Sequence, residues 1–194
     1  MTPADTKALA RALIEEARKD HTKWSLQGMG MLRLHLPDNC RLHIWDSRYR
    51  VPNVSMIHDH LQWGLESTIV AGVLTNIRYY EVRDENDTDG KDYMYTVLKP
   101  GVGCFFKEDP KPIRLDVCTR VTYGPGKSYA QQPRDIHESS PLDGTVTFMR
   151  KHPTGDESAR AFWPAGTEWV SAEPRPATKE QVEAITEYSL RKWF

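Results

Sequence analysis

Three histidines, His58, His60 and His137, are the residues of this sequence best suited to bind a metal ion. One residue separates His58 from His60, and the side chains of a strand alternate between its two faces, so both imidazoles point the same way. His137 ends the segment 133–137, which follows a Gly-Pro-Gly turn at residues 124–126. Three imidazoles from two distant strands leave coordination positions open for other ligands. The pattern therefore predicts a site for one divalent metal ion.

Glu66 is the candidate for a fourth ligand, which would be a carboxylate. Strand alternation puts Glu66 on the face of His58 and His60 only if the strand is continuous, and the Gln-Trp-Gly stretch at residues 62–64 interrupts it. We therefore expect three histidines without a protein carboxylate. Asp59 alternates to the opposite face, where we expect it to support the loop or to hydrogen-bond behind the ligands.

A set of three histidines is neutral, so a divalent ion bound there keeps its positive charge. Such a site suits an anionic ligand, for example a thiolate, together with dioxygen. Imidazole binds iron, copper, nickel and zinc, so the ligands alone do not identify the metal.

The elements that must position these histidines are mostly strands. Alternating or apolar runs, separated by clusters of Gly, Pro, Asp and Asn, predict a series of short strands. They cover residues 31–36, 40–46, 54–60, 65–82, 93–98, 113–123, 128–132 and 144–152. Many short strands with polar turns favour a closed or sandwich-like β-barrel.

A helix is expected over residues 4–20, before the first strand. Thr2 can cap it, and Asp5 lies where a capping box needs an acceptor. The apolar residues Leu9 and Leu13 lie on one face, which we expect to pack on the outside of the barrel.

A second helix is expected near the C-terminus. It begins near Thr178, with Gln181 three residues later as in a capping box, and it runs to about Lys192. Residues 153–177 are rich in Pro, Ala, Gly and Trp and are interpreted as an irregular segment that wraps the barrel. The prediction is one domain, residues 1–194, that consists of an N-terminal helix (1–24), a barrel (25–152) and the wrapping segment with the C-terminal helix (153–194).

Composition limits the classes of partner. The chain has 194 residues, 39% hydrophobic and 27% charged, which is enough for the core of one domain. The net charge of -1 indicates neither a nucleic-acid nor a membrane partner. No apolar run approaches the roughly 20 residues that cross a bilayer, and no secretory signal begins the sequence. Cys40, Cys104 and Cys118 lack metal-ligand spacing, so we expect free thiols in the cytoplasm.

Two segments resemble the two cupin motifs. The first is Ile57–His60 followed by Gly72 and Leu74, and the second runs from the Gly-Pro-Gly turn to Ile136 and His137. The spacing from His60 to Gly72 is similar to that in the cysteine dioxygenase-like branch, and the similarity covers residues 33–152. The resemblance implies an all-β fold with flanking helices, an RmlC-like jelly-roll β-barrel.

The resemblance also implies roles for residues. His58, His60 and His137 would bind Fe(II), and cysteine or another small thiol would chelate the metal before oxygen is inserted at sulfur. Arg33 lies where the family has the arginine that binds the substrate carboxylate. A guanidinium can form two parallel hydrogen bonds with a carboxylate, and the other candidates for this role are Arg78 and Arg150.

Some residues of the family pattern have no counterpart. The tyrosine that stands beside the metal on a late strand is missing from residues 147–152, although His152 is a candidate for the histidine that partners it. Tyr129 and Tyr80 are the alternative sources of a hydroxyl group near the metal. Leu65 occupies the place of the cross-linked cysteine, and also the usual place of a glutamate ligand.

The first hypothesis for function is an Fe(II) oxygenase that inserts dioxygen into a small thiol or another small organic acid. The second is a cupin isomerase, lyase or ring-cleaving dioxygenase that uses zinc, nickel or manganese. The third is a non-catalytic cupin that binds a small molecule, and metal content would separate it from the first two. Edge strands that pair across a two-fold axis would give a homodimer.

Overall fold

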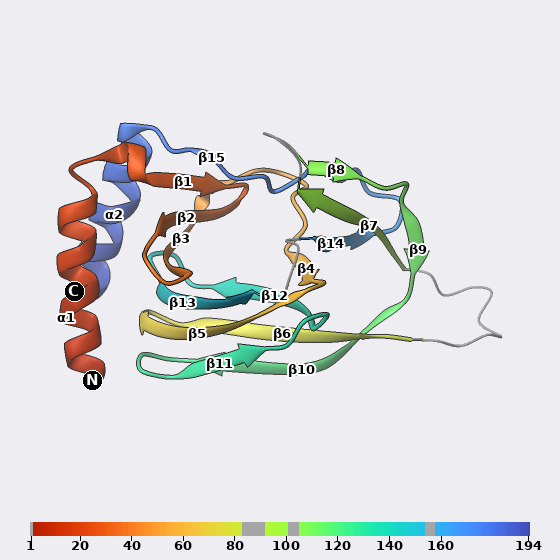
Figure 1. The fold of residues 1–194 in the computed structure, drawn as a ribbon, viewed down its shortest axis with the longest axis horizontal. Coiled ribbons are helices and arrows are strands. Elements are labelled where there is room, and N and C mark those ends of the chain that lie inside the picture. Colours follow the sequence, from red (N-terminus) through yellow and green to blue (C-terminus); the bar gives the residue numbers. More distant parts are fainter. Residues whose placement is uncertain (1, 83–91, 101–104, 154–157) are drawn as a thin grey trace.

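The described part of the chain forms two antiparallel β-sheets with two α-helices on one side (Figure 1). The computed structural model describes residues 2–82, 92–100, 105–153 and 158–194. The first sheet contains, in spatial order, β11 (Ser128–Gln131), β5 (Trp63–Ala71), β13 (Val146–Pro153), β3 (Cys40–Arg50), β2 (Met29–His35), β1 (Trp24–Gln27) and β15 (Arg175–Pro176). The second contains β10 (Leu115–Tyr123), β6 (Leu74–Glu81), β12 (Ile136–Pro141), β4 (Ile57–His60), β14 (Ala159–Pro164), β7 (Tyr93–Pro100) and β8 (Phe105–Lys107), and β9 (Lys111–Ile113) pairs with β7.

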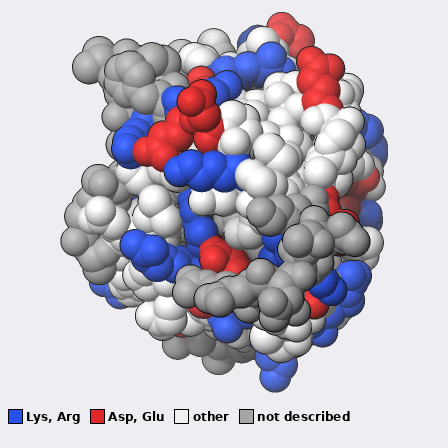
Figure 2. Space-filling model, turned by 90° about the vertical axis from the view of Figure 1, so that its right-hand side faces the viewer, with Lys and Arg blue, Asp and Glu red and all other residues white. Residues whose placement is uncertain are grey.

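This arrangement confirms the predicted all-β class with flanking helices. Both sheets curl, as Figure 1 shows, and they are compatible with a β-barrel or a jelly roll. The charged side chains on the end away from the helices are interspersed, with Lys and Arg next to Asp and Glu (Figure 2).

The predicted strand 65–82 is in fact two strands in different sheets. β5 belongs to the first sheet and β6 to the second, and the chain crosses between them at Gly72. Gly72 has φ +84, and a Cβ atom there would lie 2.5 Å from Oγ1 of Thr145. Residues 69–74 are apolar apart from Gly72, so the glycine is the only sign of a turn in this part of the sequence.

Both helices begin with the predicted capping boxes. Thr2 and Asp5 cap α1 (Pro3–Ala17), and Thr178 and Gln181 cap α2 (Lys179–Trp193). A 3-10 turn, η1 (His21–Lys23), follows α1, so the first helix ends before residue 20.

The helices pack on the outer face of the first sheet, but α1 uses a different face from the predicted one. Ala10, Ile14 and Ala17 are buried, whereas 49% of Leu9 is exposed. The prediction of a Leu9 and Leu13 stripe is therefore wrong. The helical period places Ala10, Ile14 and Ala17 on one stripe, and this stripe packs against the sheet. The buried core between helices and sheet includes Ile14, Trp24, Leu26, Leu32, Leu42, Ile44, Val146, Val182 and Ile185.

Residues 153–177 are not irregular throughout. Ala159–Pro164 forms β14, which pairs with β4 on one side and with β7 on the other. The composition of this segment, rich in Ala, Trp and Pro, did not predict the strand β14, which joins β4 to β7 in the second sheet. No helix among the described residues has the length and apolar character needed to span a membrane. Cys40 and Cys118 are free thiols, and Cys104 lies outside the described residues.

Candidate metal centre

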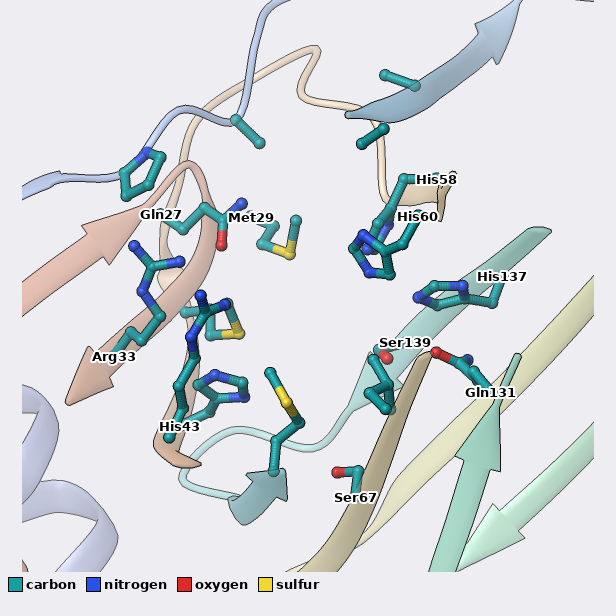
Figure 3. A pocket seen from close by; sticks show the side chains of 18 of the residues that line it. Gln27, Met29, Arg33, His43, His58, His60, Ser67, Gln131, His137 and Ser139 are labelled. Carbon is teal, nitrogen blue, oxygen red and sulfur yellow. The ribbon is translucent and has the colours of Figure 1, made fainter. Parts of the chain in front are cut away.

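The three predicted histidines meet inside the protein. His58 and His60 lie on β4, and His137 lies on the neighbouring strand β12, directly opposite His58. One potential ligand atom from each ring lies within 4.8 Å of the other two. Figure 3 shows the three rings converging from the same side of a cavity. Strand alternation and one antiparallel register are therefore sufficient to assemble the cluster.

Backbone carbonyl groups orient two of the rings. Nδ1 of His58 lies 3.0 Å from the carbonyl oxygen of Met56, and Nδ1 of His137 lies 2.8 Å from that of Asp135. A neutral imidazole that donates from Nδ1 keeps its lone pair on Nε2, which is then free to bind a metal. The third ring, His60, stacks on the indole of Trp63 with 3.5 Å between centroids.

The cluster could hold a divalent metal ion. Burial lowers the pKa of His58, and it lowers the pKa values of His60 and His137 well below 6.5, so all three rings are neutral at neutral pH. Metal–nitrogen bonds of about 2.0–2.1 Å bring two ligand atoms within about 4.2 Å of each other. Shifts of less than about 1 Å in these side chains would achieve that separation.

Asp59 lies between the two histidines of β4 but points to the opposite face, as predicted. It is completely buried and accepts hydrogen bonds from the backbone N–H of Arg160 at 2.9 Å and from its Nε at 2.7 Å. Arg160 also forms an ion pair with Glu81 at 2.5 Å. Asp59 therefore fastens β4 to β14 and is not a metal ligand.

A cavity of about 200 Å³ lies in front of the three histidines. Alternate residues of the surrounding strands line it, because each strand presents every second side chain to the interior. The lining from the first sheet includes Met31, Arg33, Arg41, His43, Trp45, Trp63, Leu65, Ser67, Tyr129, Gln131, Thr147, Met149 and Lys151.

The wall across the cavity from the histidines is basic. Arg33 and His43 are cross-strand partners in β2 and β3, and Arg33 donates a hydrogen bond to Oγ of Ser25 at 3.2 Å. Figure 3 shows both side chains on the side opposite His58, His60 and His137. Arg41 also lines the cavity. Lys151 lines it on the side of His60, because its Nζ lies 4.6 Å from the centroid of the Trp63 ring that stacks on His60. The three histidines thus belong to the second sheet and the basic groups to the first.

Strand alternation agrees with the expectation that Glu66 is not a ligand, and it corrects the prediction for His152. Both residues are exposed, and neither lines the cavity. Their neighbours Leu65 and Lys151 are buried and do line it. Glu66 is therefore not placed to bind the metal, and the prediction that His152 acts beside the metal is wrong by one position along β13.

Three other candidates do not line the cavity. Arg78 donates to the carbonyl of Ala130 and pairs with Asp135, and Arg150 is exposed on the outer face of β13. Tyr80 is 49% exposed. Arg78 lies directly opposite His137 in the β6–β12 register and therefore shares its face, but its guanidinium is held by Ala130 and Asp135. None of the three side chains lines the cavity, so the lining does not support the predicted roles of Arg78 and Arg150 in binding substrate or of Tyr80 beside the metal.

Tyr129 does line the cavity. Burial raises the pKa of its hydroxyl, which hydrogen-bonds with Ser67 and Ser139. The hydroxyl is therefore protonated at neutral pH and can donate a hydrogen bond.

The sequence predictions did not include Arg41, Lys151 or Gln131, and they left open which way His43 faces. In residues 41–45 and 147–151 every second side chain lines the cavity, so the two-residue period of a strand is the sequence signal that groups these residues. The period alone does not say which of the two sets of alternating residues faces the cavity. The register of β3 with β2, in which His43 lies opposite Arg33, decides this.

Acidification is expected to destabilise the metal-free protein. Burial lowers the pKa of His43, His58, His60 and His137 below their ordinary value of 6.5. Below that pH the unfolded chain binds protons that the folded protein does not, so stability falls by up to about 1.4 kcal/mol per pH unit for each group. We expect the urea midpoint to decrease as the pH falls below 6.5, and to decrease less steeply in His43→Leu. A midpoint independent of pH in this range would contradict the expectation.

No protein-family model matches the chain, and no curated protein sequence matches it.

Proposed function

We propose that the protein is a cupin enzyme that oxidises a small thiol-bearing acid with dioxygen at an Fe(II) ion bound by His58, His60 and His137. The observation that carries the proposal is the position of three neutral histidines at one side of a cavity whose other side is basic. The mostly β fold and the turn at Gly72 support the cupin assignment.

The basic wall accounts for the charge of the substrate. A carboxylate that leaves water for a protein interior needs a charged partner, and a guanidinium provides two parallel hydrogen bonds. Arg33 is the first candidate for this contact, and the positive charges of Arg41 and Lys151 favour the same ligand. The acid group would therefore bind on the first sheet, while the thiolate faces the three histidines.

Iron at the three histidines would supply the redox centre at which the thiolate and dioxygen meet. The overall conversion is balanced, because a thiolate and one dioxygen molecule yield a sulfinate when both oxygen atoms join sulfur and no atom leaves. No external reductant is therefore required. Trp63, Leu65 and Met149 restrict water around the reacting sulfur, since their side chains are buried in the same lining.

The test is oxygen consumption by iron-loaded protein. We expect uptake with cysteine or 3-mercaptopropionate and one sulfinate formed for each dioxygen consumed. Arg33→Ala is expected to raise KM at least about tenfold, since a hydrogen bond to a charged group contributes ~1.5–3 kcal/mol, and to leave iron content unchanged. The matched control is Arg150→Ala, which removes an outward-facing arginine.

Absence of oxygen uptake with a panel of thiol acids, despite full iron loading, would contradict the thiol assignment. The protein would then belong with the cupin isomerases, lyases or ring-cleaving dioxygenases. Failure to bind any divalent metal would instead favour a non-catalytic small-molecule-binding cupin.

A further inference from the structure

Gln131 is a buried polar residue in the cavity whose bonding is incomplete. It ends β11 and is 3% exposed, and neither Oε1 nor Nε2 of its side chain has a hydrogen-bond partner among the residues that the structure describes. Buried amide groups are normally paired, because water no longer satisfies them. A carboxamide with both polar atoms unpaired indicates that its partner is a molecule that binds in the cavity.

The surroundings of Gln131 place it on the histidine side. Gln131 lies directly opposite Leu65 in the β5–β11 register, so both side chains project into the same cavity. Leu65 offers no polar atom, which leaves Gln131 as the polar group at this position of the wall. Figure 3 shows Gln131 on the same side of the cavity as His137, with Arg33 and His43 across from it.

We propose that Gln131 donates a hydrogen bond from Nε2 to an anionic ligand bound at an open position of the metal. The proposal rests on the metal site assigned above. A neutral amide suits this role, because it stabilises an anion next to the metal without competing with the imidazoles for the metal ion. A carboxylate at the same place would repel the anion.

The experiment uses Co(II) as the metal and azide as the anionic ligand, because Co(II) absorption in the visible range reports both binding events. Gln131→Met keeps the length of the side chain and removes both polar atoms. We expect this variant to bind Co(II) as the wild type does but to bind azide at least about tenfold more weakly. Gln131→Glu is expected to weaken azide binding further, and it controls for a change in packing.

Gln27 provides the matched control, because it lines the same cavity from the far wall. Gln27→Met is expected to change neither Co(II) binding nor azide binding. Equal azide affinity in the wild type and Gln131→Met would overturn the proposal while leaving the metal site intact. Loss of Co(II) itself in Gln131→Met would overturn it too, in favour of direct coordination. If wild-type protein binds no Co(II), the metal site and this inference fail together.

Discussion

His137→Ala is expected to reduce the affinity of the protein for Fe(II) or Co(II) by at least about 100-fold, since changes behind a ligand already cost 10–100-fold. His137 is the only ligand of the three that does not come from β4, and it faces His58 across the β4–β12 register. Without His137, only the two imidazoles of β4 remain as protein ligands, and two ligands bind a divalent metal ion much more weakly than three. Equilibrium competition with a coloured chelator measures the change directly.

Two outward-facing residues provide the controls for this measurement. Glu66→Ala and His152→Ala remove a carboxylate and an imidazole that are close in sequence to the cavity lining but exposed. Both variants are expected to bind the metal as the wild type does. Full metal binding by His137→Ala, or loss of binding in Glu66→Ala, would contradict the assignment of three histidines.

Arg160→Met is expected to cost about 3–5 kcal/mol of unfolding free energy, because it leaves the carboxylate of Asp59 buried without its partner. Asp59 is completely buried, and the guanidinium of Arg160 is 14% exposed. The pair fixes β14 to β4, so metal affinity is expected to fall as well. Urea unfolding of the metal-free protein measures the stability, and chelator competition measures the affinity.

A double variant separates the buried charge from the loss of packing. Asp59→Asn removes the charge but keeps an oxygen for the backbone N–H of Arg160. We expect Asp59→Asn combined with Arg160→Met to be more stable than Arg160→Met alone. The exposed Arg150→Met should change stability by no more than about 0.5 kcal/mol. If the double variant is no more stable than Arg160→Met, the buried charge is not the cause.

The cluster of three histidines could be predicted from local sequence because its geometry is local. His58 and His60 share a face through the two-residue period of a strand, and His137 has its own turn and strand. Both helix starts were equally predictable, because a capping box such as that of Thr178 and Gln181 depends on residues three positions apart.

The rest of the site depends on register, which one sequence does not reveal. A shift of one residue along β13 replaces His152 by Lys151 in the cavity, and a shift along β5 replaces Glu66 by Leu65. Neither pair differs in strand propensity enough to decide which residue faces inward. Arg41 and Lys151 were missed for this reason, and Gln131 is recognised only through its missing hydrogen bonds.

The histidines and Arg33 lie on different sheets, and this has a consequence for the length of the proposed substrate. The three histidines belong to one sheet and Arg33 to the other, so the spacing of the two backbones determines the distance between the two ends of a bound molecule. Packed sheets lie about 10 Å apart, and small shifts of one sheet over the other change that distance. A substitution in a connection such as Gly72, which does not line the cavity, could therefore change the length of the acid that fits the proposed site without changing Arg33 or the three histidines.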